Sequence, residues 1–351
     1  MQQEIIFSNT IEHSLKEILA NTVADRFFIL TDTQSSNLCM PLLRELCKYH
    51  NIVEITIGDT DANKNIESLA KVWQSLGDNG ASRKSVLINL GGGMITDLGG
   101  FAAASFKRGI SFFNIPTTLL GAVDASVGGK TGINFNGLKN EIGVFAPAKA
   151  VLISTEFLTT LDEENIKSGY AEMLKHGLID KPSHYEALIN YDFKKVDSDS
   201  LLELMRMSVA LKEEVVAKDP FEKGIRKALN LGHTVGHAFE SLAFQQGKAM
   251  LHGYAVAWGL VCELILSHRQ CGFPLDVLKQ TADFVKKHYG YMPFTCKEYD
   301  LLYEFMKHDK KNEGHGINFT LLTNIGEIEI NQTATKESVY TMFDIFRDLF
   351  E

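Results

Sequence analysis

The sequence predicts an α/β N-terminal Rossmann-like domain with a parallel sheet, residues 1–160, followed by a mainly α-helical C-terminal domain, residues 161–351. Three observations support this prediction. The chain has 351 residues, more than a single hydrophobic core usually supports. Its first part alternates short apolar or β-branched runs with helix-like stretches, as βαβ units do. Beyond about residue 160, apolar residues recur at three- and four-residue spacing, which is typical of amphipathic helices.

The strands expected in the first domain are five short apolar runs, at residues 26–31, 51–57, 85–90, 111–115 and 150–154. In parallel sheets of this type, ligands bind at the carboxyl ends of the strands. The expected binding loops therefore begin at Thr31, Gly58, Gly91 and Pro116.

The helices expected in the second domain are long amphipathic segments, at residues 164–180, 198–217, 228–245, 253–269, 275–289 and 336–350. One β-like run, residues 317–323, interrupts them.

Composition and charge exclude several classes of protein. The hydrophobic content of 45% and the charged content of 23% are ordinary for globular proteins. A net charge of -9 disfavours broad binding to nucleic acid or to anionic membranes. The five cysteines include no Cys-x-x-Cys pair, so neither a disulfide framework nor a thiolate zinc site is indicated. The N-terminus does not resemble a signal peptide, and we expect a cytoplasmic protein.

A glycine-rich turn follows the predicted strand at residues 85–90. Gly91, Gly92 and Gly93 precede a helix rich in small residues. Glycines let the backbone approach a pyrophosphate, and a helix N-terminus attracts anions, so the turn favours dinucleotide binding. The Gly-x-Gly-x-x-Gly fingerprint is incomplete because Thr96 occupies the last glycine position. A tight turn without a ligand is the alternative interpretation.

Lysines, hydroxyl side chains and glycines crowd the segment 115–140. Few hydrophobic residues are present, so we expect loops and a short helix that bind a phosphate or a carboxylate. Residues 128–131 resemble the end of a Walker A loop, but Asp124 stands where that loop requires its first glycine. The alternative is a solvated loop with surface lysines.

Histidines and a glutamate in the helical half indicate a metal centre. His233 and His237 are four residues apart, which places them on one face of a helix, and His252 precedes the next helix. Glu172 offers a carboxylate from a third helix. Two imidazoles, one carboxylate and an open position make a common catalytic zinc site. The spacing alone leaves open which histidines bind a metal and which are hydrogen-bonded structural residues.

Taken in order, these segments resemble the 3-dehydroquinate synthase family over nearly the whole chain. The matching blocks are residues 91–97, 107–109, 116–119, 124–134, 139–140, 169–175, 226–240 and 251–253.

The resemblance implies an enzyme that converts 3-deoxy-D-arabino-heptulosonate 7-phosphate into 3-dehydroquinate and phosphate. This is a step of the shikimate pathway, which leads to chorismate and the aromatic amino acids. The family's reaction combines transient oxidation by NAD, β-elimination of phosphate, re-reduction and intramolecular aldol closure. The resemblance therefore implies a lyase with NAD and Zn2+ or Co2+ as cofactors, and a homodimer.

The resemblance also assigns roles to residues of this chain. It implies that the metal is held by Glu172, His233 and His252. It implies NAD contacts from Asp32, Asp59, Asp61, Lys64, Gly91, Gly92, Gly93, Met94, Ile95, Thr96, Asp97, Thr117, Thr118, Asp124, Lys130, Lys139, Phe157, Leu158, Thr159 and Thr160. It implies substrate or catalytic contacts from His237, Lys130, Asn140, Lys175, Lys212, Arg226, Asn230, Lys311 and, from the neighbouring subunit, Arg108.

Three other functions remain as alternatives at this point. A related sugar-phosphate cyclase such as 2-deoxy-scyllo-inosose synthase acts on a substrate without a carboxylate, whereas Arg226 and Lys212 favour a substrate that has one. A metal-dependent dehydrogenase of the glycerol dehydrogenase type would release NADH and would need fewer cations. A non-enzymatic NAD- or metal-binding regulator is disfavoured because buried ionisable groups cost stability that only function readily explains.

Overall fold

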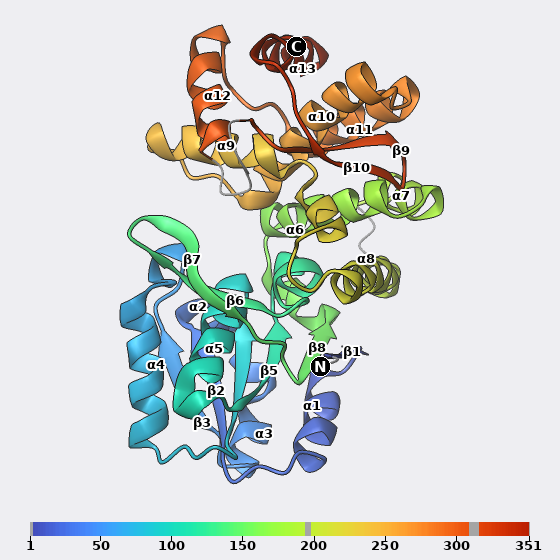
Figure 1. Ribbon diagram of the computed structural model, residues 1–351. Helices are drawn as coiled ribbons and strands as arrows, with labels where there is room; N and C mark the ends of the chain where they lie inside the picture. The colour runs from blue at the N-terminus through green and yellow to red at the C-terminus, as the bar shows by residue number, and fades with distance from the viewer. Residues whose placement is uncertain (1–2, 194–197, 309–315, 351) are drawn as a thin grey trace. The chain divides into compact units, whose positions relative to one another are not determined.

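The computed structural model describes residues 3–193, 198–308 and 316–350 (Figure 1). The chain forms two compact units, and each is described by itself. The first unit comprises Met1–Ile166 and Asp197–Val209, and the second comprises Lys167–Val196 and Ala210–Glu351. The domain boundary expected at residue 160 stays a prediction.

A six-stranded parallel sheet organises the first unit, in the order β1-β8-β5-β4-β2-β3. Its strands are β1 (Glu4–Ser8), β2 (Phe27–Asp32), β3 (Val53–Ile57), β4 (Val86–Gly91), β5 (Ser111–Pro116) and β8 (Ala150–Ser154). The chain adds β3 on one side of β2 and then returns to place β4 on the other side. The order of the strands therefore reverses at the carboxyl ends of β2 and β4, where sheets of this type bind ligands.

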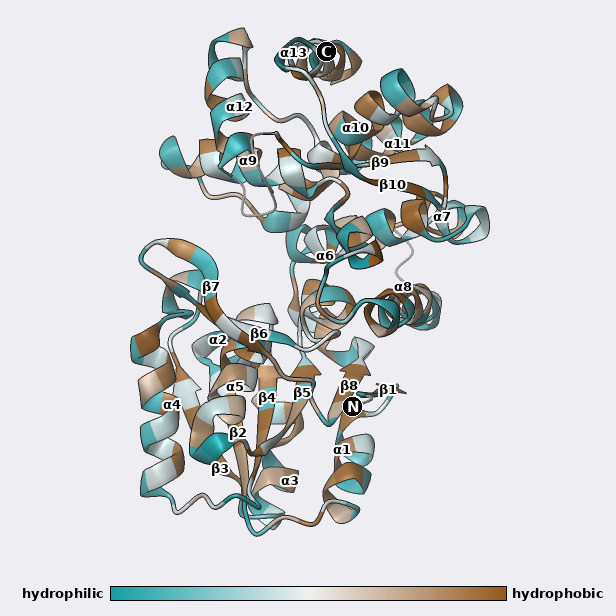
Figure 2. Ribbon diagram, viewed as in Figure 1, coloured by the Kyte–Doolittle hydropathy of each residue, from teal (hydrophilic) through white to brown (hydrophobic). Residues whose placement is uncertain are grey.

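The five predicted strands are confirmed, and the hydrophobicity of their residues explains why they form. Every residue of β4 and of β8 is buried, as expected for strands covered on both faces. Figure 2 shows these strands mostly in brown, the hydrophobic colour, whereas α4 carries brown and teal on different faces. Strand β1 was not predicted; it lies at the edge of the sheet and pairs with β8.

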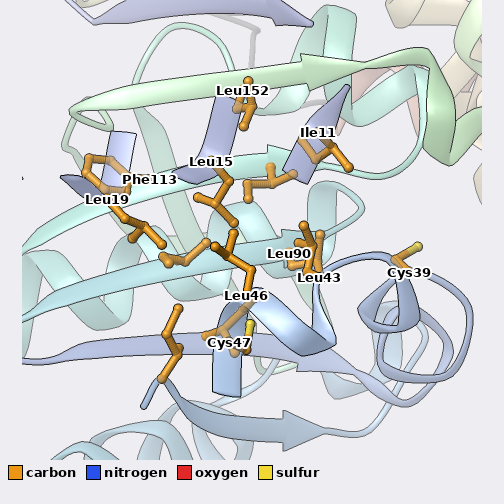
Figure 3. Packing of buried hydrophobic residues seen from close by; sticks show 14 of the residues in the cluster. Ile11, Leu15, Leu19, Cys39, Leu43, Leu46, Cys47, Leu90, Phe113 and Leu152 are labelled. Atoms are coloured by element: carbon orange, nitrogen blue, oxygen red, sulfur yellow. The ribbon is translucent and has the colours of Figure 1, made fainter. Parts of the chain in front are cut away.

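Apolar side chains pack between one face of the sheet and helices α1 (Ile11–Ala20) and α3 (Arg44–Tyr49). Leu15 and Leu19 of α1 lie close to Phe113 and Leu152 of the strands in Figure 3. The buried residues of α1 recur at four-residue spacing, which directs one helix face towards the core.

The remaining helices of the sheet region are α2 (Thr33–Leu38), α4 (Ile66–Asp78) and α5 (Gly93–Ser105). The side chain of Asn65 caps α4 by accepting a hydrogen bond from the Ser68 amide. Trp73 of α4 donates a hydrogen bond to the carbonyl of Ala102 in α5, which ties the two helices together.

The structure corrects the prediction for residues 115–140. The short helix expected there is present as a π-helical turn, Gly121–Ala125, but from Lys130 onwards the chain forms an antiparallel hairpin of β6 (Lys130–Phe135) and β7 (Leu138–Phe145). Asn136 and Gly137 connect the strands with φ values of 49° and 77°. An Asn-Gly pair favours a tight hairpin turn of this kind, so the sequence itself contains a signal for this hairpin.

The second unit is mainly helical, as predicted. Its helices are α6 (Glu163–Ile179), which begins in the first unit, α7 (Pro182–Ile189), α8 (Ser198–Lys218), which the two units share, α9 (His233–Gln245), α10 (His252–Cys271), α11 (Leu275–Tyr289), α12 (Tyr299–Lys307) and α13 (Lys336–Phe350). The predicted helix at 228–245 began too early. Gly232 has a φ of +79°, so a 3-10 turn, Ile225–Asn230, ends before α9 begins.

A two-stranded antiparallel sheet completes the second unit. It pairs β9 (Phe319–Asn324), which was predicted, with β10 (Glu327–Gln332), which was not. Helices α7 and α12 were also not predicted. Within the described residues, each helix lacks the combination of length and hydropathy that a membrane span requires.

Candidate active site

Three potential metal ligands meet in the second unit, each from a different helix. Glu172 lies in the middle of α6, His233 is the first residue of α9, and His252 is the first residue of α10. Glu172 Oε1 lies 3.4 Å from His233 Nε2 and 3.2 Å from His252 Nε2. The three ligand atoms all lie within 4.8 Å of one another.

The carboxylate of Glu172 is fully buried and divides its two oxygens between different partners. Oε2 forms an ion pair with Lys175, one helical turn further along α6. Burial raises the pKa of Glu172, but the Lys175 ammonium and the His233 imidazole outweigh burial and hold that pKa well below its usual range. Oε1 receives no hydrogen bond from the described part of the chain. An ionised, buried oxygen without a donor is costly unless a cation neutralises it.

Both imidazoles are oriented by groups on their other ring nitrogen. His233 Nδ1 lies 3.1 Å from the carbonyl oxygen of Leu231, and His252 Nδ1 lies 3.3 Å from Glu240 Oε2. In the neutral ring with the hydrogen on Nδ1, which is the form that binds a metal, the Nε2 lone pair points towards Glu172. Metal-binding histidines show this pattern, in which a carbonyl or a carboxylate accepts the second N–H.

The electrostatics around His252 favour positive charge. Burial lowers the pKa of His252, but its contacts with the Glu172 and Glu240 carboxylates outweigh burial and raise that pKa to about 10. The same carboxylates attract a metal cation. One carboxylate oxygen and two imidazole nitrogens form a donor set that suits Zn2+ or Co2+.

His237 lies next to this group, one turn after His233 on the same face of α9. Its ring centroid is 5.6 Å from that of His233 and 6.1 Å from that of His252. His237, Glu240 and His252 form a second set of potential ligands. His252 belongs to both sets. Its Nδ1 faces Glu240, and its Nε2 faces Glu172, so Nε2 is the potential ligand atom in the set that contains Glu172.

Close contact between α6 and α10 holds two of the potential ligands in place. The Gly253 amide donates a 3.0 Å hydrogen bond to Ser168 Oγ. A Cβ atom on Gly253 would lie 1.8 Å from the Ser168 carbonyl oxygen, so only glycine allows this approach. Ser168 and Glu240 were not recognised from the sequence as contributors to the site.

Buried cations of the second unit include Lys175, Lys212 and Arg226. The Arg226 side chain donates a 2.6 Å hydrogen bond from Nη1 to the Pro220 carbonyl oxygen. Asn230 donates from Nδ2 to Glu222 Oε1 at 2.8 Å.

Asp219 shapes the loop that carries Arg226. Its carboxylate accepts hydrogen bonds from the backbone amides of Lys223, Gly224 and Arg226. Burial raises the pKa of Asp219, but these three hydrogen bonds outweigh it and lower that pKa. The sequence did not identify the roles of Asp219 and Glu222.

Lys311, which the resemblance assigns to the substrate, lies outside the described residues.

The predicted glycine-rich turn lies at the carboxyl end of β4 in the first unit. Gly92 precedes α5, and its lack of a side chain leaves the start of that helix without a side-chain cap. A Cβ atom on Gly92 would lie 3.1 Å from the Thr118 side chain, and one on Gly93 would lie 3.0 Å from the Ala125 Cβ. The amide of Thr117 donates to the Gly91 carbonyl at 3.0 Å. The turn and the loop after β5 are thus adjacent.

Several residues assigned to the cofactor and the substrate form one polar network in the first unit. Lys64 is buried, and its ammonium lies 2.5 Å from Asp97 Oδ2 and also donates to Asn140 Oδ1. Asn134 Oδ1 accepts from the Asn140 amide, and Asn134 Nδ2 donates to Asp61 Oδ2. The hairpin that the sequence did not predict supplies both asparagines to this network.

The other residues of the first unit that the resemblance assigns to the cofactor or the substrate have varied surroundings. Asp32 caps α2 by accepting from Ser35, and Asp59 accepts from Gln34. Arg108, Lys130 and Lys139 are exposed, and Met94, Asp124 and Thr118 are half-buried.

Three of the residues that the resemblance assigns to NAD have side chains that point into the protein. Ile95 and Leu158 are buried, and Phe157 belongs to the core beneath the sheet. Contacts from these residues to a cofactor would come from the backbone. Thr96 is also buried, and its hydroxyl donates to the Gly93 carbonyl, whereas Thr159 is exposed and Thr160 half-buried.

The sequence matches two family descriptions in succession. Residues 54–168 match "3-dehydroquinate synthase N-terminal", and residues 169–312 match "3-dehydroquinate synthase C-terminal". A 3-dehydroquinate synthase from Parabacteroides distasonis is 50% identical over 349 residues, which are 99% of each chain.

Two solved structures of sugar-phosphate cyclases share the fold. A 2-epi-5-epi-valiolone synthase from Streptomyces hygroscopicus subsp. jinggangensis 5008, solved with NAD+ and Zn2+ bound, matches with a TM-score of 0.89 and 23% identity. The match covers 99% of this chain and 97% of the other. A 2-deoxy-scyllo-inosose synthase, solved with carbaglucose-6-phosphate, NAD+ and Co2+, matches with a TM-score of 0.84 and 21% identity over 98% and 96% of the two chains. At these identities the likeness shows the fold alone.

We predict that Glu240→Gln weakens the affinity for Zn2+ about 10- to 100-fold, because an amide holds the His252 ring less firmly than a carboxylate does. Competition against a chromophoric chelator measures this affinity. Glu186→Gln in α7, which removes an exposed carboxylate from the same unit, is the control and should bind Zn2+ as the unchanged protein does. Equal affinity in Glu240→Gln would contradict the orienting role.

Proposed function

This chain belongs to the 3-dehydroquinate synthase family, and from that premise we propose that it converts 3-deoxy-D-arabino-heptulosonate 7-phosphate into 3-dehydroquinate and phosphate with NAD and a divalent metal ion as cofactors. The observation that carries the proposal is the buried Glu172 Oε1, which faces two imidazole Nε2 atoms and receives no hydrogen bond from the described residues. The full-length relative at 50% identity supports the choice of substrate.

The reaction moves through oxidation, elimination, reduction and ring closure. The C5 hydroxyl of the substrate becomes a ketone, which acidifies the proton on C6. Loss of that proton breaks the bond from C7 to phosphate. The C5 ketone is then reduced again, the sugar ring opens, and an intramolecular aldol reaction closes the carbocycle. When bound, NAD takes and returns one hydride, and the metal ion polarises the oxygen at the carbon being oxidised.

Residues of the second unit would hold the metal and move protons. Glu172, His233 and His252 supply the ligands, and Lys175 keeps the Glu172 carboxylate ionised through their ion pair. His237 lies beside the ligands without belonging to the Glu172 set. That position suits a proton acceptor or a contact to the substrate phosphate.

Residues of the first unit would hold NAD. The glycine-rich turn at the carboxyl end of β4 exposes the amides that begin α5, and a helix N-terminus favours a pyrophosphate. The buried Lys64 forms an ion pair with the half-buried Asp97 beside the hairpin, which would fix the loops around the cofactor.

Cations would bind the two anionic groups of the substrate. An acidic protein of net charge -9 must gather positive charge locally to attract a phosphate and a carboxylate. Lys212 and Arg226 are both buried, and a buried cation binds an anion more strongly than an exposed one. We assign the substrate carboxylate to these two residues, and further substrate contacts to Lys130, Asn140, Lys175 and Asn230.

Further parts of the proposal rest on the family alone. The chain would act as a phosphate-eliminating carbon-oxygen lyase in the cytoplasm. It would form a homodimer in which Arg108 reaches the substrate of the neighbouring subunit.

We expect the purified protein, given the heptulosonate phosphate, NAD+ and Zn2+, to release phosphate and form dehydroquinate without net accumulation of NADH. Phosphate release, absorbance of NADH and product chromatography measure the three quantities. Removal of the metal with a chelator should abolish turnover, and added Zn2+ or Co2+ should restore it. Stoichiometric NADH would instead indicate a dehydrogenase.

We predict that Arg226→Ala raises the KM for the heptulosonate phosphate about 10- to 100-fold, because a charge-assisted hydrogen bond to a carboxylate contributes about 1.5–3 kcal/mol. Steady-state kinetics measure the change. Lys223→Ala, which removes an exposed cation from the same loop, is the control and should leave the KM unchanged. Circular dichroism checks that both variants are folded. An unaltered KM for Arg226→Ala would indicate a substrate without a carboxylate.

A further inference from the structure

Helix α10 contains a buried glutamate that neither the proposed metal site nor the substrate contacts use. Glu263 has no exposed surface, and the other residues of the stretch 259–266 are apolar or glycine. Burying a carboxylate in such surroundings is costly unless it accepts strong hydrogen bonds. The partners of Glu263 should therefore explain its presence.

Two of those partners are backbone amides at the start of α9. Glu263 Oε2 accepts from the Gly232 amide at 2.6 Å, and Oε1 accepts from the Val235 amide at 3.2 Å. Gly232 is the N-cap residue of α9, and Val235 is its third residue. A capping box satisfies the same two amides with side chains of its own helix. Here one carboxylate from α10 satisfies both.

The N-cap position explains why the cap comes from another helix. Gly232 has a φ of +79° and no side chain, so α9 cannot cap itself there. A Cβ atom on Gly232 would lie 2.8 Å from the Leu260 side chain, and one on Gly259 would lie 2.0 Å from the Gly232 carbonyl oxygen. The start of α9 therefore lies directly against α10. The positive end of the α9 dipole also favours a carboxylate at this point.

The capped turn carries one of the potential metal ligands. His233 lies between the two residues whose amides Glu263 accepts, and its ring is held by the Leu231 carbonyl. Helix α10 begins with His252, about three turns before Glu263. Helix α10 thus provides one potential ligand, His252, and holds the backbone on either side of a second potential ligand, His233.

We propose that Glu263 is a positioning residue that orients His233 relative to His252 and so sets the geometry and affinity of the metal centre. The inference rests on the proposed function, because it assumes that these two histidines bind the metal. Glu263 acts through the backbone of α9.

The test is Glu263→Gln in the full-length protein. Glutamine has the same shape but only one acceptor oxygen, and its amide group cannot accept from the second backbone N–H. We expect the variant to bind Zn2+ about 10- to 100-fold more weakly, as measured by chelator competition well below its melting temperature. With Co2+ bound, its visible absorption spectrum should shift, because the ligand geometry changes.

Tyr185→Phe is the matched control. It removes a buried 2.8 Å hydrogen bond to Thr281 in the same unit, between α7 and α11. It should lower the melting temperature but leave the Zn2+ affinity and the Co2+ spectrum unchanged. If Glu263→Gln behaves as this control does, losing stability with unaltered metal binding, then Glu263 is only structural and the inference is overturned.

A measurement on the unchanged protein covers the case in which Glu263→Gln does not fold. Hydrogen exchange should show strong protection of the Gly232 and Val235 amides, and weaker protection at the start of α11, where Pro274 provides no side-chain cap. Rapid exchange at Gly232 and Val235 would overturn the inference. Failure of the unchanged protein to bind Zn2+ or Co2+ would instead overturn the proposed function, so the two failures are distinguishable.

Discussion

The second unit depends on one electrostatic constraint, a fully buried carboxylate with an oxygen that receives no hydrogen bond from the described residues. Glu172 lies in a stretch of α6 in which every residue from Ser168 to Ile179 is buried. Lys175 neutralises one oxygen, and the other faces two imidazole nitrogens. Positive charge at that point stabilises such an arrangement, and the raised pKa of His252 shows that its surroundings favour it. The proposed divalent cation would supply that charge.

Much of the remaining architecture of this unit serves to bring three helices together at that point. Gly253 lets α10 approach α6, and the glycines at 232 and 259 let α9 approach α10. Because the contacts at Gly253 and Gly259 involve backbone atoms on both sides, they define the helix positions more rigidly than side-chain packing alone would. Two of the potential ligands, His233 and His252, are therefore carried by helix starts and Glu172 by the middle of α6, so that their positions do not depend on flexible loops.

In the first unit, glycines and buried polar side chains bring together the loops that are expected to bind NAD. Its parallel sheet directs the loops after β2, β4 and β5 to one edge, and glycines there leave room beside the start of α5. Lys64 links the loop after β3 to α5 through Asp97 and to the hairpin through Asn140. The polar network thus connects segments that lie far apart in the sequence.

The sequence by itself determined the fold class, five of the six strands of the parallel sheet, most helices of the second unit and the residue types of the proposed metal centre. These follow from local periodicity and from motifs whose residues are neighbours in the chain. Strands β6 and β7 were also within reach, because Asn136 and Gly137 mark the turn between them. Only the tertiary structure decided that Glu240 holds His252, that Asp219 shapes the Arg226 loop, and that Glu263 caps α9 from 28 residues beyond Val235. Hydrogen bonds of this kind join residues distant in sequence, and no local pattern records which partner a buried carboxylate will meet.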